Sequence, residues 1–382
     1  MFTMTKIAYF NEGSSIYDYF FLKHLSTQFD VFFISFNSNP KYLPEGIPFI
    51  KLPMFMKKLP AHDSPRIYST IPLSALLLKK ALKNIKPDVL IGCGGLGYGL
   101  YATFSKYKPF ILFIWGSEVM VWPRFFPFRA FVKYSLKEAD LVVLDSYIHA
   151  KASVNLGCDT EKIVVLPWID SKEIEESVKK ARKERNIFRK RFNWRGDDLV
   201  VISTRSHEKI YDIETLVRAI PIVLQNVPNI RFLLLGEGSL TLKLKSMVYK
   251  LGVQEAVRFV GFVPHDEIFY YLRNSDIYVS TSLSDGTSAS LLEAMMSGLA
   301  CLVSNIPGNR EWINDNENGM LFPVRDHEKL AQKIILLAED NDLRKNLGEK
   351  ASITVREKAD WKKNSRILYE KLESLAKISK SF

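Results

Sequence analysis

Thirteen short apolar runs, separated by longer stretches compatible with helices, constrain the fold of this chain most strongly. The first half contains KIAYF, FDVFFISF, IPFIKLP, PDVLIG, KPFILFIWG, ADLVVLDS and KIVVLPW, and the second half contains DLVVIST, IRFLLLGEG, VRFVGFVP, SDIYVSTS, LACLVSN and NGMLFPV. Most runs are continuously apolar, which is typical of strands buried on both faces of a parallel sheet. The sequence therefore predicts an α/β fold with two doubly wound, Rossmann-like domains, one in each half.

The 382 residues exceed one ordinary core, since a domain takes roughly 150 residues. The charged stretch 171–198 has no strand character and predicts a linker with a surface helix, so that the domain boundary falls near Ser171 to Trp194. We expect an N-terminal domain over 1–175 and a C-terminal domain over 195–355. The tail, 356–382, has apolar residues at helical spacing, which are Ile367, Leu368, Leu372 and Leu375.

The bulk properties narrow the class of protein. The three cysteines, Cys93, Cys158 and Cys301, lack zinc-site spacing and fit a reducing cytoplasm. The N-terminus MFTMTKIAYFNEGSS lacks the apolar core of a signal peptide, and no run approaches the ~18 apolar residues of a spanning helix. We therefore expect a cytoplasmic protein. The formal net charge of +11 favours a polyanionic ligand or surface.

The loops that follow the predicted strands carry the polar residues of interest. In SLSDGTSASLLEAMMSG, which follows a strand, the backbone N–H groups near Gly286 to Ala289 are expected at a helix N-terminus, where phosphate binds well. The same stretch also fits a capping box of Ser290 and Glu293, with Asp285 as a turn residue. Arg205 and Lys209 follow a neighbouring strand and would complete a diphosphate site. His207 between them is interpreted as a solvated loop residue.

In this order, TRSHEKIYDIETLVRAI, RFLLLGEGSL, VRFVGFVPHDEI and SDIYVSTSLSDGTSASLLEAMMSGLACLVSNIPGNREWINDNENGMLFPV resemble the GT-B glycosyltransferases of the retaining family 4 type, over Thr204 to Val324. The resemblance implies two Rossmann-like domains that face a central cleft, with the tail from Trp361 crossing back to the first domain. It also implies transfer of a sugar from a nucleotide diphosphate sugar, for which we expect UDP, without a metal or other cofactor. The DND motif at Asp340 to Asp342 falls in a helical region and is interpreted as a turn.

The resemblance also assigns roles to residues of the second half. In the family pattern of glutamate, seven residues, glutamate, Asp285 stands in place of the first glutamate and Glu293 is the second. Glu293 would hold the ribose, Asp285 would face the transferred sugar, and Arg205 and Lys209 would bind the diphosphate. The remaining donor contacts implied by the resemblance are Gly286, Thr287, Ser288, Gly261, Phe262 and Val263.

The first half resembles the family more loosely. In NEGSSIYDYF, Gly13 and Ser14 stand where the family's glycine loop approaches donor phosphate and acceptor, although a tight turn before a helix has the same pattern. Trp115 replaces the family's usual histidine, so that a histidine role in positioning the acceptor is not carried over. Glu118 is predicted on the acceptor side, and a carboxylate that caps the next segment fits equally.

Two other functions fit parts of the sequence. GCGGLGYG contains Gly92, Gly94 and Gly97, a G-x-G-x-x-G after a strand, which would suit an NAD-dependent oxidoreductase. Close helix-to-sheet packing explains these glycines as well, and the motif explains none of the second-half residues. A non-catalytic nucleotide-sugar-binding subunit of the same fold is favoured by the two departures from the family pattern, Trp115 and Asp285.

Two charged segments suggest partners. The basic cluster of the linker has no stacking platform and is interpreted as a solvated helix face rather than a nucleic-acid site; its members are Lys179, Lys180, Arg182, Lys183, Arg185, Arg189, Lys190 and Arg191. VWPRFFPFRAFVKYSLK, residues 121–137, mixes aromatic and basic residues, as segments on an anionic membrane surface do, and a core helix with a basic outer side has the same pattern. The sequence therefore predicts a transferase with a glycan or lipid-linked acceptor in envelope glycan synthesis, at the inner face of the membrane. It leaves the oligomeric state open.

Overall fold

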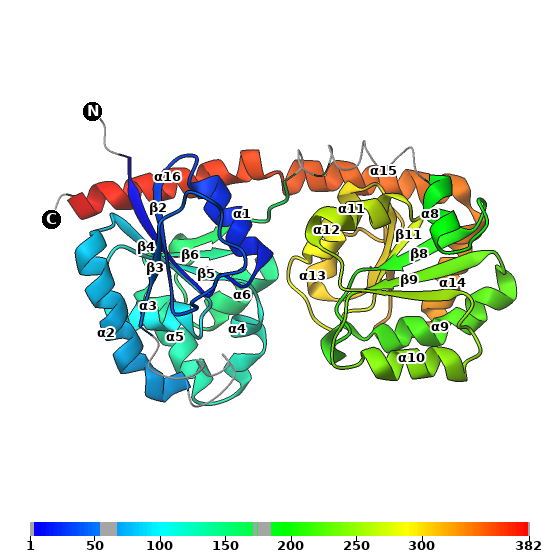
Figure 1. The fold of residues 1–382 in the computed structure, drawn as a ribbon, viewed down its shortest axis with the longest axis horizontal. Helices are drawn as coiled ribbons and strands as arrows, with labels where there is room; N and C mark the ends of the chain where they lie inside the picture. Colours follow the sequence, from blue (N-terminus) through cyan, green and yellow to red (C-terminus); the bar gives the residue numbers. More distant parts are fainter. Residues whose placement is uncertain (1–3, 54–66, 171–173, 175–184, 381–382) are drawn as a thin grey trace. The chain divides into compact units, whose positions relative to one another are not determined.

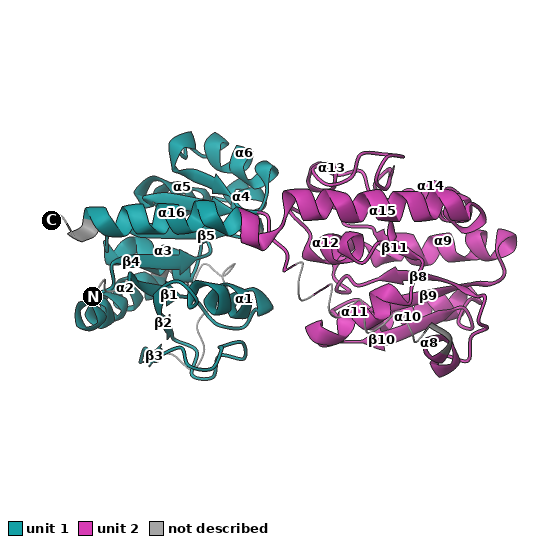
Figure 2. Cartoon of the chain, turned by 90° about the horizontal axis from the view of Figure 1, so that it is seen from above, with its two compact units in different colours: residues 1–166, 364–382 teal, residues 167–363 magenta. Residues whose placement is uncertain are grey.

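The computed structural model describes residues 4–53, 67–170, 174 and 185–380, and it divides the chain into two compact units. Unit 1 comprises Met1–Leu166 and Asn364–Phe382, and unit 2 comprises Pro167–Lys363 (Figure 2). The predicted boundary, near Ser171 to Trp194, and the basic cluster lie partly outside the described residues, because only residue 174 is described between 171 and 184.

Unit 1 is built on a seven-stranded parallel sheet of order β3-β2-β1-β4-β5-β6-β7. Its strands are β1 (Lys6–Phe10), β2 (Asp30–Ser35), β3 (Phe49–Lys51), β4 (Val89–Cys93), β5 (Phe110–Ile114), β6 (Leu141–Leu144) and β7 (Ile163–Val165). Each lies within one of the seven apolar runs of the first half, except that β4 extends one residue beyond its run, to Cys93. The central strands are fully buried because helices cover both faces of the sheet.

Helices cover the unit 1 sheet from both sides (Figure 1). They are α1 (Ile16–Leu25), α2 (Ile67–Ile85), α3 (Tyr98–Ser105), α4 (Ser117–Met120), η1 (Trp122–Arg124), α5 (Phe128–Glu138), α6 (Tyr147–Asn155), η2 (Thr160–Lys162) and α16 (Trp361–Lys380). Right-handed crossovers place α1 on one face and α2, α3 and α5 on the other, because the strand order reverses between β1 and β4. On the α1 face, the Tyr369 ring of α16 lies 5.5 Å from the ring of Phe29.

Unit 2 is built on a six-stranded parallel sheet of order β10-β9-β8-β11-β12-β13. Its strands are β8 (Leu199–Ser203), β9 (Ile230–Leu235), β10 (Val257–Gly261), β11 (Ile277–Ser280), β12 (Ala300–Ser304) and β13 (Met320–Phe322). They lie within the six apolar runs of the second half. The predicted α/β fold with two doubly wound sheets is therefore confirmed.

Alternate side chains of the unit 2 strands contribute to two separate hydrophobic cores, one on each face of the sheet. Val201, Phe232 and Val279 pack under α9 (Ile213–Asn226), α10 (Thr241–Lys250) and α14 (His327–Glu339). Val200, Leu233 and Tyr278 pack on the opposite face. The helices of that face are α8 (Arg185–Arg191), α11 (His265–Arg273), α12 (Ala289–Met296) and α15 (Asn341–Lys358), and the short elements are η3 (Lys209–Tyr211) and α13 (Pro307–Arg310).

Arg189 corrects the interpretation of the basic linker as a solvated helix face. Its side chain is fully buried, and its Nη2 lies 3.0 Å from Oδ2 of Asp276. The Nε donates to the carbonyl oxygen of Asp198 at 2.9 Å. Phe188 beside it is also buried, so α8 belongs to the core of unit 2. No local pattern indicates this burial, because the carboxylate partner lies 87 residues further along the chain.

Replacing Arg189 by methionine is expected to destabilise unit 2 by about 3–5 kcal/mol, since it leaves the Asp276 carboxylate buried without its cationic partner. The measurement is the midpoint of urea unfolding. Lys190→Met is the matched control because Lys190 is the exposed neighbour on the same helix, and it should shift the midpoint little. Equal midpoints for the two variants would contradict a structural role for the ion pair.

Candidate functional site

The candidate site lies where the strand order of unit 2 reverses. β8 and β11 are neighbours there, and the chain continues outward from them in opposite directions. In open parallel sheets ligands bind beyond the carboxyl ends of strands at such a reversal. Arg205 follows β8 by two residues, and the loop of Asp285 to Ser288 follows β11 and leads into α12.

Arg205 is the centre of this site. Its Nη2 lies 2.6 Å from Oδ2 of Asp285, and its Nη1 donates to the hydroxyls of Ser288 and Ser290 at 2.6 and 2.7 Å. The guanidinium also lies 4.0 Å from the centre of the Tyr211 ring, a cation–π contact. The side chain is almost buried. A cation fixed in this way holds one orientation, which suits binding of an anionic ligand.

The helix N-terminus in the site is capped by Ser288. Its hydroxyl accepts from the backbone N–H of Leu291, and α12 begins at Ala289. The alternative capping box of Ser290 and Glu293 is therefore wrong: the Ser290 hydroxyl instead accepts from Arg205 and from the hydroxyl of Tyr278, at 3.0 Å for the latter. Burial raises the pKa of Tyr278 to about 12, so this hydroxyl remains a donor.

Glu293 lies one turn further along α12. It is largely buried, and its Oε1 lies 2.9 Å from Nε2 of His265 at the start of α11. Because α11 follows β10, the pair joins loops from two strand ends of the same sheet edge. A carboxylate held by one partner keeps its second oxygen available to accept from a ligand hydroxyl.

The other predicted residues of unit 2 lie around this edge. Lys209, in η3, is exposed and forms no ion pair or hydrogen bond with any residue that the structure describes. Gly261 ends β10, and its carbonyl accepts from the N–H of Gly236 at 2.8 Å. Phe262 is 63% exposed, and Val263 is buried. The site thus has one fixed cation, Arg205, and one exposed cation, Lys209.

The loop that carries Asp285 is held by close packing. A Cβ atom on Gly308 of α13 would lie 2.3 Å from the Asp285 carbonyl oxygen and 2.5 Å from that of Gly286. Only glycine allows this approach. Trp312 adds a hydrogen bond from its Nε1 to the hydroxyl of Thr287, at 3.3 Å. Close packing at Gly308 and the hydrogen bond from Trp312 therefore hold the predicted ligand-binding loop in place.

His207 corrects its interpretation as a solvated loop residue. Its side chain is buried, its Nδ1 lies 2.9 Å from the Thr241 hydroxyl, and its ring meets Phe259 edge-on. Burial lowers the pKa of His207. The imidazole therefore stays neutral and anchors the segment that carries Arg205 to α10.

In unit 1 the strand order reverses between β1 and β4, and the predicted Gly13 and Ser14 follow β1. Gly13 is buried with φ +73, and a Cβ atom there would lie 2.6 Å from Pro40. Ser14 is exposed and donates to Glu12 at 3.1 Å. Ser15 caps α1 in a capping box with Asp18. Gly13 and Ser14 thus form the turn into α1. Both a glycine loop beside donor phosphate and acceptor and a simple structural turn have this arrangement.

Trp115 and Glu118 follow β5. The Trp115 ring stacks on Tyr17 at 6.2 Å and tilts against Phe21 at 5.2 Å. Glu118 accepts from the backbone N–H of Gly116 at 2.9 Å. The carboxylate therefore caps its own turn rather than the next segment, and its other oxygen faces the loop at Gly94.

The glycine motif after β4 has a packing explanation. A Cβ atom on Gly92 would lie 2.7 Å from Ala102, and one on Gly99 would lie 1.8 Å from the Gly94 carbonyl oxygen. Gly92 and Gly99 therefore let α3 pack directly on the sheet, as the packing interpretation proposed for Gly92, whereas Gly94 and Gly97 have positive φ angles of 83° and 71°.

No group of three or more His, Cys, Asp or Glu side chains in residues 4–53, 67–170, 174 and 185–380 is placed to bind a metal. In the DND motif, Asp340 is the N-cap of α15 and accepts from the N–H of Leu343 at 2.8 Å. The motif therefore begins a helix.

Sequence reasoning missed several residues of the site. His265, Tyr211, Ser290 and Trp312 all contact a predicted residue, and although they lie within the quoted motifs none of them was assigned to the site. His265 could have been found, because it opens the helix after β10 and the carboxyl ends of parallel strands share one edge. The other contacts depend on side-chain directions that the sequence does not specify.

Two family models match this chain. "Glycosyl transferase 4-like" matches residues 6–146, and "Glycosyl transferases group 1" matches residues 184–353. The chain belongs to the glycosyltransferases of the family 4 type with a GT-B fold. Its fold is similar to that of Anabaena HepE, crystallised with UDP and glucose, at a TM-score of 0.78 and 18% identity over 97% of this chain and 100% of that one.

Relatives by sequence include the putative glycosyltransferase EpsD of Bacillus subtilis, 24% identical over 63% of this chain and 61% of that protein. A phosphatidylinositol N-acetylglucosaminyltransferase component from Arabidopsis thaliana is 32% identical over 66% of this chain and 54% of that protein. The chain thus spans about half to three fifths of the length of these relatives.

Acidification is expected to weaken the fold through His207. Because burial lowers its pKa, the unfolded chain takes up a proton at a higher pH than the folded one. The stability it contributes is full above the ordinary pKa of about 6.5 and decreases as the pH falls below that value. The urea midpoint of His207→Gln should therefore fall less than that of the wild type between about pH 7.5 and pH 5.5. His327→Gln, at the start of α14, is the control, and parallel curves for all three proteins would refute the role of His207.

Proposed function

We propose that this protein is a retaining glycosyltransferase that moves a sugar from a UDP-sugar to a glycan or lipid-linked acceptor in envelope glycan synthesis. The observation that carries the proposal is the buried Arg205 beside the capped N-terminus of α12, with Glu293 one turn along the same helix. A fixed cation and helix N–H groups suit a diphosphate, and a buried carboxylate suits the hydroxyls of a ribose.

The proposed chemistry follows from where charge develops. The bond between the anomeric carbon and the diphosphate oxygen breaks, so negative charge builds on the leaving diphosphate. Arg205, Lys209 and the N–H groups at the start of α12 stabilise this charge without reorganising. The acceptor oxygen bonds to the anomeric carbon from the same side, and its proton passes to a phosphate oxygen of the donor. Asp285 contacts the sugar through the oxygen not paired with Arg205. No metal takes part in these steps.

The names of the relatives support parts of this proposal. HepE was crystallised with UDP and glucose, which supports a UDP-linked donor. The Arabidopsis relative is named for transfer to phosphatidylinositol, which supports a lipid-linked acceptor. EpsD is named only as a putative glycosyltransferase.

A non-catalytic nucleotide-sugar-binding subunit is the second candidate. It is favoured by the ion pair that occupies Asp285 and by the aromatic cluster that holds Trp115 in the place of the family's histidine. Such a protein would bind the donor without turnover. An NAD-dependent oxidoreductase is not proposed, because packing explains the glycine motif.

We also propose that the enzyme works at the anionic inner face of the membrane. Of the aromatic residues in 121–137, Phe125 and Phe126 are 54% and 88% exposed, whereas Phe128 is buried. The segment is therefore part core helix and part exposed aromatic surface. No helix within the described residues has the length and apolar character needed to span a bilayer.

Glu293→Ala is expected to weaken UDP binding by roughly 10- to 150-fold, because hydrogen bonds to a charged group contribute about 1.5–3 kcal/mol. Isothermal titration with UDP, GDP and ADP measures the effect and identifies the base. The control is Glu255→Ala, which removes an exposed carboxylate of the same unit. Unchanged UDP affinity in a folded Glu293→Ala protein would exclude the proposed ribose contact.

Turnover of a UDP-sugar is expected to continue in excess EDTA, since Arg205, Lys209 and the helix N–H groups take the place of a metal. Release of UDP measures turnover, and NMR of the product gives the anomer, which should match that of the donor. Binding of the donor without any turnover over a panel of glycan and lipid acceptors would favour the non-catalytic subunit. Loss of activity in EDTA would contradict the metal-independent chemistry.

A further inference from the structure

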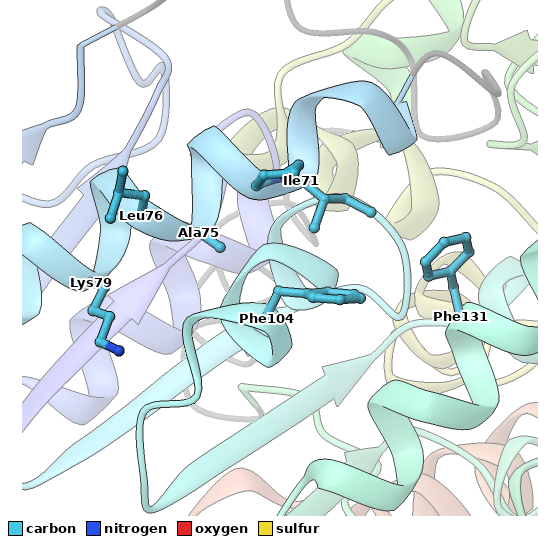
Figure 3. A pocket seen from close by; sticks show the side chains of 7 residues that line it. Ile71, Ala75, Leu76, Lys79, Phe104 and Phe131 are labelled. Atoms are coloured by element: carbon cyan, nitrogen blue, oxygen red, sulfur yellow. The ribbon is translucent and has the colours of Figure 1, made fainter.

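Unit 1 contains a hollow that the donor site does not use. Its volume is about 470 Å³, within the range of about 300–1,000 Å³ found for small-ligand sites. It lies between α2, α3 and α5, on the face of the sheet opposite α1. Figure 3 shows Ile71 and Ala75 of α2 on the side facing Phe104 of α3, with Phe131 of α5 at one end and Lys79 at the other. Six of its seven lining residues are apolar: Ile71, Pro72, Ala75, Leu76, Phe104 and Phe131.

Exposed apolar side chains lie on or next to two of the helices that form this hollow. On α2, Leu73 and Leu76 are 41% and 62% exposed. Phe125 and Phe126 directly precede α5, the helix that contributes Phe131 to the hollow. Leu76 both lines the hollow and reaches solvent, so apolar surface continues from the interior of the hollow to the outside. Apolar surface of this kind marks a binding region rather than scattered surface residues.

Positive charges predominate on the helices that line the hollow. α2 and α3 contain no aspartate or glutamate, and the one acidic residue of α5, Glu138, is paired with Lys106 at 3.0 Å. Their exposed cations include Lys79, Lys80 and Lys83 on α2 and Arg124, Arg129 and Lys133 at and before α5. None of these six side chains forms an ion pair with the residues that the structure describes. Lys79 lines the hollow and Lys80 and Lys83 follow it on α2, so the rim on the α2 side is cationic. A cationic rim beside an apolar hollow matches a molecule with a hydrocarbon chain and an anionic head.

We propose that this hollow binds one hydrocarbon chain of an anionic membrane lipid, with Lys79 and the neighbouring cations contacting the phosphate of the headgroup. The site deepens the membrane contact proposed above and does not depend on the donor site in unit 2. A second copy of the chain is a poorer occupant, because it would bring the same cationic rim against this one.

The first measurement is co-sedimentation with phosphatidylcholine vesicles, with and without phosphatidylglycerol. We expect the wild type to bind only the anionic vesicles. Lys79→Glu should lower the partition coefficient by more than tenfold, since it changes the charge by two and each charge contributes about fivefold. Leu76→Ser should lower it by about tenfold through loss of apolar contact.

Matched controls come from unit 2. Leu242 is 82% exposed on α10, and Lys250 is an exposed lysine on the same helix. Leu242→Ser and Lys250→Glu repeat the two chemical changes with the same net charge, and they should leave vesicle binding unchanged. Equal binding by the hollow variants and these controls would overturn the proposal, and so would equal binding of both kinds of vesicle.

The second measurement separates the hollow from the membrane surface. Isothermal titration with dodecyl phosphate below its micellar concentration should show saturable binding, with much weaker binding of dodecyl maltoside and none of inorganic phosphate. Ala75→Phe, which fills the hollow, should abolish it, whereas Phe125→Ser with Phe126→Ser should weaken vesicle binding and leave dodecyl phosphate bound. Dodecyl phosphate binding that survives Ala75→Phe would overturn the proposal.

Each failure has its own signature. If the Phe125 and Phe126 double variant abolishes vesicle binding and the hollow variants do not, the membrane contact stands and the hydrocarbon site fails. Glu293→Ala should bind lipid normally, and the hollow variants should bind UDP normally. The lipid experiments can therefore be interpreted even if the proposed donor site proves wrong. Self-association in sedimentation velocity that Leu76→Ser abolishes, with vesicle binding unchanged, would assign the hollow to a second copy and overturn the proposal.

Discussion

Burial of both faces of two parallel sheets is the constraint on which the rest of this structure depends. Parallel strands require helical crossovers, and the crossovers cover the sheet on both sides, so the strands are mostly apolar and most polar groups lie outside them. They gather in the loops at the carboxyl edge. At β8 and β11 the strand order reverses, so the chain leaves these two strands in opposite directions. The loops that follow them bring Arg205 and Asp285 into contact at this point.

The charges of unit 2 show two different uses of a buried arginine. Arg189 of α8 pairs with Asp276 within the core, so the pair specifies how that helix docks. Arg205 pairs with Asp285 at the edge of the sheet, where two hydroxyls and a helix N-terminus also converge. An anionic ligand therefore meets a cation that is already oriented, and most of the ordering cost is met by the folded protein.

Much of the fold could be predicted because its signal is local. All thirteen strands fall at predicted apolar runs, with only Cys93 of β4 beyond its run, since a strand buried on both faces is apolar at most positions. The site was predicted less completely. Arg205, Asp285 and Glu293 were found through a family pattern and strand-end position, whereas His265 and Tyr211 were not, because their contacts depend on how α11 and η3 dock. Arg189 and His207 were misjudged for the same reason, since burial of a single polar residue depends on partners distant in the sequence.

The sequence by itself determined the two doubly wound sheets, the glycosyltransferase family and the position of the candidate donor loop, because hydrophobic runs and short motifs are properties of neighbouring residues. Only the tertiary structure decided that Ser288 rather than Ser290 caps α12, that Glu293 pairs with His265, and that an apolar hollow with a cationic rim lies between α2, α3 and α5. These features bring together side chains from separate elements. Their distances follow from packing of whole helices on the sheets, which no local stretch of sequence encodes.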